Sequence, residues 1–314
     1  MPDVPLHWML LNDRRRLRLY ERAIAARVRP GDVVVDLGAG TGILGFFALR
    51  AGARRVYAVE KRPILHLARA LARANGFADR IRFLAGRSDR VRPPERADLL
   101  VTEILGSLAF DEEIVRYVRD ARARFLTPRG RVIPSRVDLI ACPVHAPAFH
   151  RSLGARVAGF DFGPFHDLAR NSALHRPRPT GRALATPAAV IAIEFEGRRF
   201  APVDDEHLAG RARLRIRRPG VLHALRLWFD AVLAPGIVLS SSHGTHWANP
   251  YLPVSPPIPV RPGDDLRLHM TLSRAENISW DYTLSRRGPR VAAGAHSTHL
   301  ADERLFAPRR GVRR

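Results

Sequence analysis

The apolar positions in the first part of the chain follow two different periods. Between residues 8 and 28, Leu17, Tyr20, Ile24 and Val28 recur at helical spacing with arginines between them, which predicts one amphipathic helix. From residue 33 to residue 133, short apolar runs alternate with segments of helical period. Strands are expected at 33–37, 55–59, 81–84, 98–102 and 131–133, and helices at 43–50, 64–75 and 113–125. We therefore predict an N-terminal helix within residues 1–28 and a doubly wound α/β domain over residues 29–136.

The pattern changes after Pro134. Short apolar or alternating runs, broken by proline and glycine, favour strands, and they lie at 190–195, 211–216, 222–229, 265–272 and 278–284. They predict a β-rich second domain over residues 137–314. Within it, residues 148–187 begin with a helical pattern and continue with prolines and arginines, so this segment is either an inserted arm or a long loop. Residues 308–314, with four arginines, are predicted to form a basic tail.

Composition narrows the class of protein. A chain of 314 residues with 46% hydrophobic residues can bury one large core or two smaller ones. No apolar run approaches the ~18 residues that a spanning helix needs, and the N-terminus lacks the features of a cleaved leader. We therefore expect a cytoplasmic protein with no membrane partner. The single cysteine, Cys142, excludes an internal disulfide framework, and no set of potential ligands has metal-site spacing.

The net charge of +22 comes almost entirely from arginine, because Lys61 is the only lysine. A basic chain attracts nucleic acid non-specifically, so a nucleic-acid partner stays possible. No nucleic-acid-binding motif supports it, and aromatic residues make up only 7% of the chain. The alternative is an ordinary solvated basic surface.

Three glycines mark a candidate nucleotide site. Gly38, Gly40 and Gly42 follow the first strand of the α/β domain and precede a helix. Glycine is required where a tight turn brings the backbone close to a ligand, and the helix start offers free N–H groups. The glycines therefore indicate an adenosine-bearing ligand, and a plain tight turn is the alternative.

Acidic residues near the glycines favour S-adenosylmethionine over a dinucleotide. Asp36 precedes a G-x-G-x-G spacing, whereas the dinucleotide fingerprint would need a glycine at Ile43. Glu60 ends the second strand, where a carboxylate can accept both ribose hydroxyls. S-adenosylmethionine carries a sulfonium cation and no pyrophosphate, so it tolerates the neighbouring acids. Asp89, after the third strand, is predicted to meet the adenine edge or to cap its own loop.

A second candidate site follows the fourth strand. Glu103 and Glu112 lie nine positions apart on either side of Gly106, and ligands of an open α/β sheet bind at the carboxyl ends of its strands. Two carboxylates there can bind a cation. Alternatively both are solvated, or Glu112 or Glu113 caps the following helix.

This loop resembles the double-glutamate loop of the protein arginine N-methyltransferases. Its Ile104-Leu105-Gly106-Ser107 filling is similar to one branch of that family. Far along the chain, Thr245-His246-Trp247 resembles the threonine-histidine-tryptophan loop of the same family. The resemblance extends from about residue 7 to residue 300.

The resemblance implies a fold and roles for several residues. The fold is a Rossmann-like methyltransferase domain followed by a β-barrel-like domain with a helical arm insertion that mediates dimerisation. Arg16 would bind the cofactor carboxylate, and Asp13 would pair with His246. His246 would accept or relay the released proton, and Trp247 would line the substrate channel. A satisfied barrel histidine and an ordinary core tryptophan are the alternatives for the last two.

The favoured hypothesis is methyl transfer from S-adenosylmethionine to a guanidinium nitrogen of an arginine-containing protein or peptide, with a homodimer possible. In this hypothesis Glu103 and Glu112 bind the guanidinium as a bidentate fork. Two alternatives stay open. One is a methyltransferase for a small-molecule or natural-product acceptor, and the other is a catalytically weak scaffold associated with nucleic acid.

Overall fold

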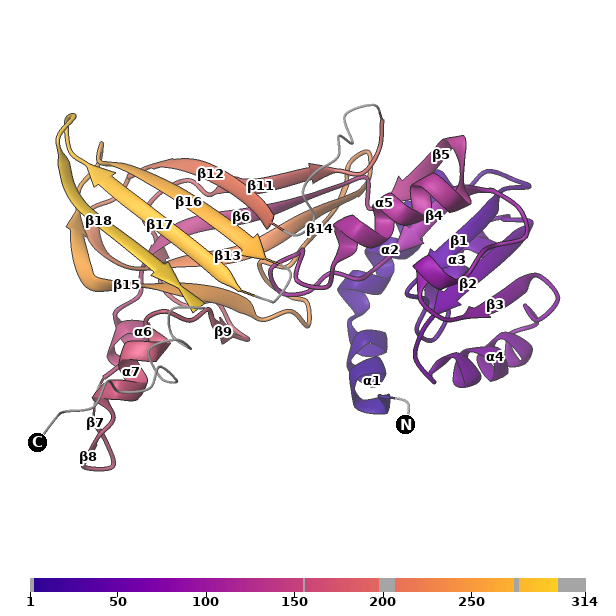
Figure 1. The fold of residues 1–314 in the computed structure, drawn as a ribbon, viewed down its shortest axis with the longest axis horizontal. Coiled ribbons are helices and arrows are strands. Elements are labelled where there is room, and N and C mark those ends of the chain that lie inside the picture. Colours follow the sequence, from indigo (N-terminus) through magenta and orange to yellow (C-terminus); the bar gives the residue numbers. More distant parts are fainter. Residues whose placement is uncertain (1–2, 155, 198–206, 274–276, 299–314) are drawn as a thin grey trace, which may run out of the picture. The chain divides into compact units, whose positions relative to one another are not determined.

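The computed structural model describes residues 3–154, 156–197, 207–273 and 277–298 (Figure 1). The predicted basic tail at 308–314 lies outside the described residues. The chain forms two compact units. Unit 1 contains Met1–Asp138, Ala192–Asp205 and Phe229–Trp247, and unit 2 contains Leu139–Ile191, Glu206–Trp228 and Ala248–Arg314. Two stretches of the predicted second domain thus belong to the same unit as the α/β domain.

The N-terminal segment forms two helices, whereas the sequence predicted one. Helix α1 spans Val4–Asn12 and helix α2 spans Arg14–Arg27. The break falls at Asp13, whose carboxylate accepts the backbone N–H of Arg16 at 2.9 Å and so caps α2. The predicted apolar stripe remains correct for α2, because Tyr20 and Ile24 are fully buried.

Unit 1 is built on a parallel sheet of five strands, which confirms the predicted doubly wound α/β architecture (Figure 1). The strands are β1 (Val33–Leu37), β2 (Arg55–Glu60), β3 (Ile81–Ala85), β4 (Ala97–Thr102) and β5 (Leu126–Ile133). The connecting helices are α3 (Ile43–Arg50), α4 (Leu65–Ala74), the short η1 (Ser88–Arg90) and α5 (Ile114–Phe125). The strand order β3-β2-β1-β4-β5 reverses between β1 and β4, which is where open α/β sheets bind ligands.

The remaining strands form antiparallel sheets, which agrees with the predicted β-rich second part of the chain. A seven-stranded sheet has the order β10-β6-β13-β15-β9, with β11 pairing β6 and β14 pairing β13; a four-stranded sheet has the order β12-β16-β17-β18. The strands are β6 (Arg136–His145), β9 (Leu174–Arg176), β10 (Arg182–Ala183), β11 (Ala188–Glu194), β12 (His207–Arg215), β13 (Gly220–Ala234), β14 (Ile237–Ser240), β15 (Asn249–Val260), β16 (Asp265–Ser273), β17 (Ile278–Ser285) and β18 (Arg290–Ser297).

The segment predicted as an inserted arm or a long loop contains short helices and short strands. It contains α6 (Pro147–Arg151), a two-stranded hairpin of β7 (Arg156–Val157) and β8 (Phe160–Asp161), and α7 (Gly163–Ala169). The rest of the predicted 148–187 segment rejoins the seven-stranded sheet through β9 and β10. Prolines in this return stretch disfavour a helix, so the chain uses short strands there. We call residues 147–171 the arm.

None of the helices in the described ranges combines the length and the apolar character that crossing a lipid bilayer requires.

Candidate active site

The glycine loop between β1 and α3 is closely covered by side chains. Gly38, Gly40 and Gly42 all have positive φ, of +73°, +54° and +83°, which disfavours any residue with a Cβ. A Cβ at Gly38 would lie 2.8 Å from Ile104 Cγ2, and one at Gly40 would lie 3.2 Å from His7 Nε2. The three glycines therefore allow both the turn and the close approach of the double-glutamate loop.

His7 is a site residue that the sequence analysis missed. It is buried on α1 with its Nε2 against Gly40, and its Nδ1 lies 2.7 Å from the carbonyl oxygen of Asp3. A lone histidine in a helical pattern gives no signal of such a contact, because the fold of α1 over the loop is a tertiary feature. The His7 side chain thus covers the loop that is predicted to hold the nucleotide.

Glu60 lies beside the same loop, at the end of β2. Its Oε2 accepts the backbone N–H of Gly40 at 2.9 Å, and its Oε1 accepts that of Arg62 at 2.8 Å. Each carboxylate oxygen can accept more than one hydrogen bond. The predicted ribose-binding carboxylate is therefore oriented by the loop itself and keeps acceptor capacity for a ligand.

Asp36 occupies a different position from the other predicted cofactor residues. It is fully buried beneath the loop, and its Oδ2 accepts the backbone N–H of Gly45 at 2.8 Å. Burial raises the pKa of Asp36 to about 7, against the opposing effect of the Gly45 hydrogen bond. A carboxylate without solvent access cannot touch a ligand in this conformation, so Asp36 supports the first turn of α3.

Replacing Asp36 with asparagine should stabilise the protein at alkaline pH. Because the pKa is raised in the folded state, ionisation opposes folding, and the free energy of unfolding falls as pH rises from about 4 to about 7. The full effect above pH 7 is on the order of 4 kcal/mol at most. Urea denaturation at pH 5 and pH 8 measures it, with the exposed Asp79→Asn as control. Equal pH dependence in wild type and the Asp36 variant would contradict the assignment.

Asp89 lies on η1, where two arginines engage it. Arg87 Nη2 lies 2.9 Å from Asp89 Oδ2, and Arg116 Nη2 lies 3.7 Å from the same oxygen. The hydrogen bond from Arg87 and the charges of both arginines lower the pKa of Asp89, although desolvation opposes them. Asp89 is therefore held in a surface ion-pair network. Its predicted contact with an adenine edge stays a prediction.

Arg16 and Glu103 form a buried ion pair at the start of the double-glutamate loop. Their side chains are only 4% and 9% exposed, and Arg16 Nη1 donates to Glu103 Oε2. Burial raises the pKa of Glu103 to about 7; the charge of Arg16 lowers it, and the charge of Glu112 raises it. Arg16 Nη2 also donates to the carbonyl of Leu10 at 2.7 Å, whereas its buried Nε has no partner.

Two further side chains fix the end of β4, from which Glu103 emerges. The Tyr20 hydroxyl donates to the carbonyl of Thr102 at 2.9 Å, and the Thr102 hydroxyl donates to the carbonyl of Leu37 at 2.8 Å. Both side chains are fully buried. Helix α2 and the neighbouring strands therefore set the position of Glu103, a role for Tyr20 and Thr102 that sequence patterns did not indicate.

The loop between β4 and α5 carries both predicted glutamates. Gly106 lies under the Asp111 side chain, because a Cβ at Gly106 would lie 2.1 Å from Asp111 Oδ1. Glu112 is exposed, and its charge contributes to the raised pKa of Glu103. The two carboxylates are thus within electrostatic reach of each other.

Asp13 and His246 are in contact, as the resemblance implied. Asp13 Oδ2 lies 2.9 Å from His246 Nδ1 and also accepts the backbone N–H of His246 at 2.9 Å. Burial raises the pKa of Asp13, but hydrogen bonds from His246 and from the backbone of Arg16 outweigh it and lower the pKa overall. An ionised Asp13 accepts a hydrogen bond from Nδ1–H, which keeps the proton on Nδ1 and leaves Nε2 of His246 as the acceptor nitrogen.

Trp247 packs against the double-glutamate loop. Its indole N–H donates to the carbonyl of Leu105 at 2.7 Å, and its ring meets Phe229 edge-on with the centroids 4.9 Å apart. Only 6% of Trp247 is exposed. The residue predicted to line a substrate channel therefore also anchors the loop that carries Glu103.

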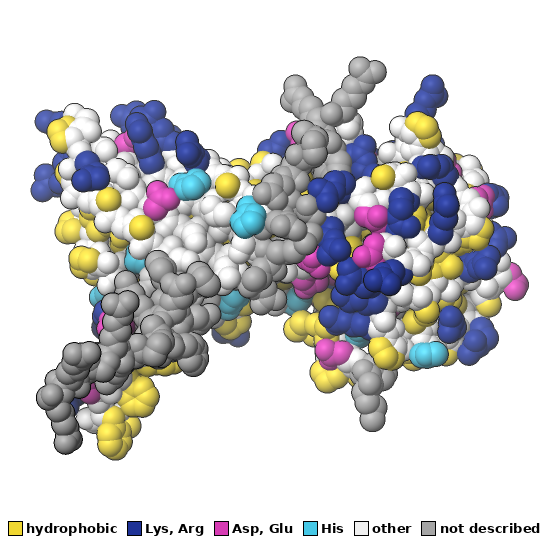
Figure 2. Space-filling view, in the orientation of Figure 1, with side chains coloured by type: hydrophobic (Ala, Val, Ile, Leu, Met, Phe, Trp, Pro, Cys, Tyr) yellow, Lys and Arg dark blue, Asp and Glu magenta, His cyan; other side chains and the backbone are white. Residues whose placement is uncertain are grey.

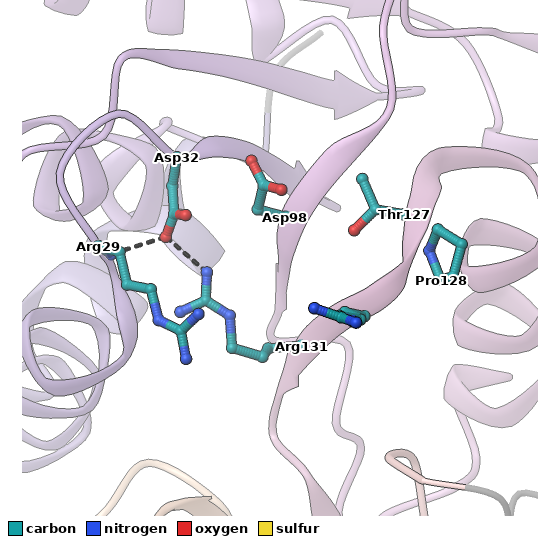
Figure 3. Close-up of a pocket in the computed structure, with 7 residues that line it drawn as sticks. Arg29, Asp32, Asp98, Thr127, Pro128 and Arg131 are labelled. Atoms are coloured by element: carbon teal, nitrogen blue, oxygen red, sulfur yellow. Dashed lines mark hydrogen bonds and ion pairs between the residues drawn. The ribbon is translucent and has the colours of Figure 1, made fainter.

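A surface pocket of about 370 Å³ lies at the other end of the sheet, next to the first residues of β1 and β4 (Figure 3). Arg131 Nη2 contacts Asp32 Oδ2 at 2.6 Å there, and Asp98 Oδ2 accepts the backbone N–H of Val33 at 3.0 Å. None of the predicted site residues lines this pocket. We assign these contacts to the fold, because ligands of such sheets bind at the opposite edge.

In the part of the chain that the structure describes, no group of three or more His, Cys, Asp or Glu side chains is arranged as a metal site.

Comparisons with known proteins indicate the family. A family model described as ribosomal protein L11 methyltransferase matches residues 17–137. A probable protein arginine N-methyltransferase 6 of Arabidopsis thaliana is 31% identical over 236 residues, which cover 72% of this chain and 54% of the relative. An arginine N(omega)-methyltransferase of Streptomyces achromogenes subsp. streptozoticus is 29% identical over 273 residues, which cover 84% of this chain and 75% of the relative. The chain spans about half the length of the Arabidopsis relatives that it matches.

The fold is similar to that of a solved structure, the Trypanosoma brucei PRMT1 enzyme-prozyme heterotetrameric complex with AdoHcy. The TM-score is 0.82 at 23% identity, and the alignment covers 93% of this chain and 97% of that one. At this identity the likeness concerns the fold. With a methyltransferase model matched over the α/β domain and named relatives matched over most of the sequence, the chain belongs to the protein arginine N-methyltransferase family.

Proposed function

We propose that this protein transfers a methyl group from S-adenosylmethionine to a guanidinium nitrogen of a protein or peptide arginine. One observation carries the proposal. The buried carboxylate of Glu103 emerges from β4 directly beside the glycine loop after β1, so closely that Ile104 leaves no room for a Cβ at Gly38. The candidate cation-binding carboxylate thus lies beside the candidate nucleotide loop at the switch point of the sheet, and this arrangement supports the proposal.

The residues around the loop fit the proposed cofactor. Arg16 keeps one buried donor, Nε, without a partner, which suits the carboxylate of an amino-acid moiety. Glu60 suits the ribose hydroxyls, and His7 covers Gly40. When bound, S-adenosylmethionine supplies an electrophilic methyl group.

Replacing Glu60 with alanine should weaken S-adenosylmethionine binding by about 1 to 3 kcal/mol, because hydrogen bonds to a charged acceptor are lost. Calorimetry measures the affinity. Glu60→Gln serves as a matched control that retains an acceptor for the Gly40 N–H. Unchanged affinity in the alanine variant would remove Glu60 from the site.

Glu103 and Glu112 would bind the acceptor. A guanidinium keeps its proton in proteins, since its pKa exceeds about 12, and it attacks only when its charge is localised away from one nitrogen. Two carboxylates can accept its N–H groups as a fork and aim the remaining nitrogen. Because the pKa of Glu103 is raised to about 7, this step requires a pH at which Glu103 is ionised.

His246 would take the proton that the methylated guanidinium releases. Asp13 holds its Nδ1 at 2.9 Å and so fixes the ring and the tautomer. Trp247 lies against the His246 ring, with the centroids 3.9 Å apart. The acceptor nitrogen Nε2 can then receive a proton directly or through water.

The decisive experiment incubates the protein with isotopically labelled S-adenosylmethionine and either an arginine-rich peptide or free arginine. Label in methylarginine after hydrolysis of the peptide supports the proposal. The relatives are named either as protein arginine methyltransferases or as an arginine methyltransferase, so the free-arginine arm tests the small-molecule alternative. Label that enters free arginine alone would overturn the protein or peptide substrate.

We also propose that the protein forms a homodimer through the arm. Phe160 and Phe165 in the arm are 70% and 63% exposed. On α1, Trp8 and Val4 are 70% and 55% exposed. Large apolar side chains gathered on a surface mark interaction sites, so the arm of one copy would pack on α1 of a second.

Light scattering of the double variant Phe160→Asp/Phe165→Asp should report a monomer where wild type is a dimer. The exposed Val291 of β18 provides a control, Val291→Asp, which should leave the dimer intact. A dimer in both variants would place the interface elsewhere.

A further inference from the structure

Strand β12 presents a row of arginines on one face. Leu208, Ala212 and Leu214 point into the unit, whereas Arg211, Arg213 and Arg215 alternate with them and are exposed. Successive exposed positions on a strand are about 7 Å apart, because each residue rises by 3.2–3.4 Å. Figure 2 shows Lys and Arg side chains gathered, together with histidine, over the β12 and β16 region.

Strand β16 adds to the same face. In the antiparallel register, Arg267 lies opposite Arg213, and His269 lies opposite Arg211. We call Arg211, Arg213, Arg215, Arg267 and His269 the arginine face. Arg213 and Arg267 therefore lie side by side on this face, where like charges directly opposite each other need a compensating group.

Two carboxylates lie among these groups: Asp281 Oδ2 contacts Nδ1 of His269 at 2.9 Å, and Asp265 lies opposite Arg215 in the register. Asp265 is 17% exposed, and its carboxylate contacts Nε of Arg213 at 2.7 Å and Nε of Arg267 at 3.6 Å. The two arginine side chains stay 73% and 71% exposed. Contacts through Nε leave the terminal amino groups available, and these can form a bidentate fork with a phosphate.

We propose that the arginine face binds the phosphate backbone of a nucleic-acid double helix. Its spacing is close to that of successive phosphates along one strand, and guanidinium groups suit phosphate oxygens. Neither β12 nor β16 contains Phe, Tyr or Trp, so the face has no platform for stacking unpaired bases. Contacts to phosphates alone make binding independent of sequence and strongly dependent on salt.

The test is fluorescence anisotropy of the full chain with a labelled 20-base-pair DNA duplex at several salt concentrations. Arg211→Glu/Arg215→Glu should weaken binding about tenfold or more. A plot of log K against log salt concentration should become less steep by about 1.8, because each lost phosphate contact accounts for about 0.9. Arg211→Gln/Arg215→Gln should show the same salt slope as the glutamate variant, with a smaller loss of affinity. The control Arg69→Glu/Arg73→Glu on α4 changes the net charge equally and should retain the wild-type slope.

If Arg211→Glu/Arg215→Glu and Arg69→Glu/Arg73→Glu weaken binding equally, the proposal is overturned, because the net charge of the chain alone would then explain binding. Tighter binding of a single strand, or equal competition by poly-glutamate of matched charge, would also overturn it. Methyl transfer to a short peptide should be unchanged in the Arg211/Arg215 variants, because neither residue belongs to the candidate active site. The result is therefore independent of the proposed methyltransferase activity.

Discussion

Replacing Glu103 with glutamine should lower the rate of methyl transfer by about 10² to 10³-fold while leaving the affinity for S-adenosylmethionine within a few-fold of wild type. Glutamine keeps an acceptor for Arg16 but loses the negative charge that would bind and orient the guanidinium. Preorganised electrostatic groups of this kind contribute about 10² to 10³-fold to rate. Transfer of label to an arginine-rich peptide measures the rate, and calorimetry measures cofactor binding.

The matched control is Glu113→Gln, ten positions along the same loop. The Glu113 carboxylate accepts hydrogen bonds from Arg116 at 3.0 Å and from the Tyr117 hydroxyl at 3.1 Å, so its loss should leave transfer close to wild type. Breaking a buried ion pair costs about 3–5 kcal/mol, so circular dichroism must show that the Glu103 variant is folded. A folded variant that loses cofactor binding would show that the loop serves the cofactor instead of the acceptor.

Replacing Asp13 with asparagine should lower kcat by about 100-fold, which is the smaller end of what general acid–base groups contribute. Asparagine can still cap α2, but it no longer provides a charge that keeps the proton on His246 Nδ1. His246→Ala should have a similar effect, and the double variant should lose little more, because the two residues act as one unit. Steady-state kinetics with the labelled cofactor measure all three.

His243 supplies the control for this pair. It lies three positions before His246, and its Nδ1 lies 2.8 Å from the Ser242 hydroxyl, so His243→Ala should leave kcat unchanged. Additive losses in the Asp13 and His246 variants would mean that they act separately. An intact rate in Asp13→Asn would assign Asp13 to the cap of α2 alone.

Elements with a local origin were predictable from the sequence. The strand Val33–Leu37 and the helix Ile43–Arg50 begin and end as predicted, because a buried apolar run and a helical stripe are bounded there by glycine and polar residues. Strand β15 was missed, since its twelve residues include Pro250, Pro253, Pro256, Pro257 and Pro259. Proline usually argues against a strand, and only pairing with β13 and β9 reveals this one.

The sequence by itself indicated candidate residues for the site: the glycines after β1, Glu60, Glu103 and Glu112. Their residue types and their places after strands are local properties, whereas the Asp13–His246 pair was implied only by the family resemblance. The tertiary structure alone decided that Asp36 lies beneath the loop, that His7 covers Gly40 and that Arg16 pairs with Glu103. These contacts join segments far apart in the chain, and burial, which sets the pKa of Glu103 and Asp36, exists only once those segments pack together.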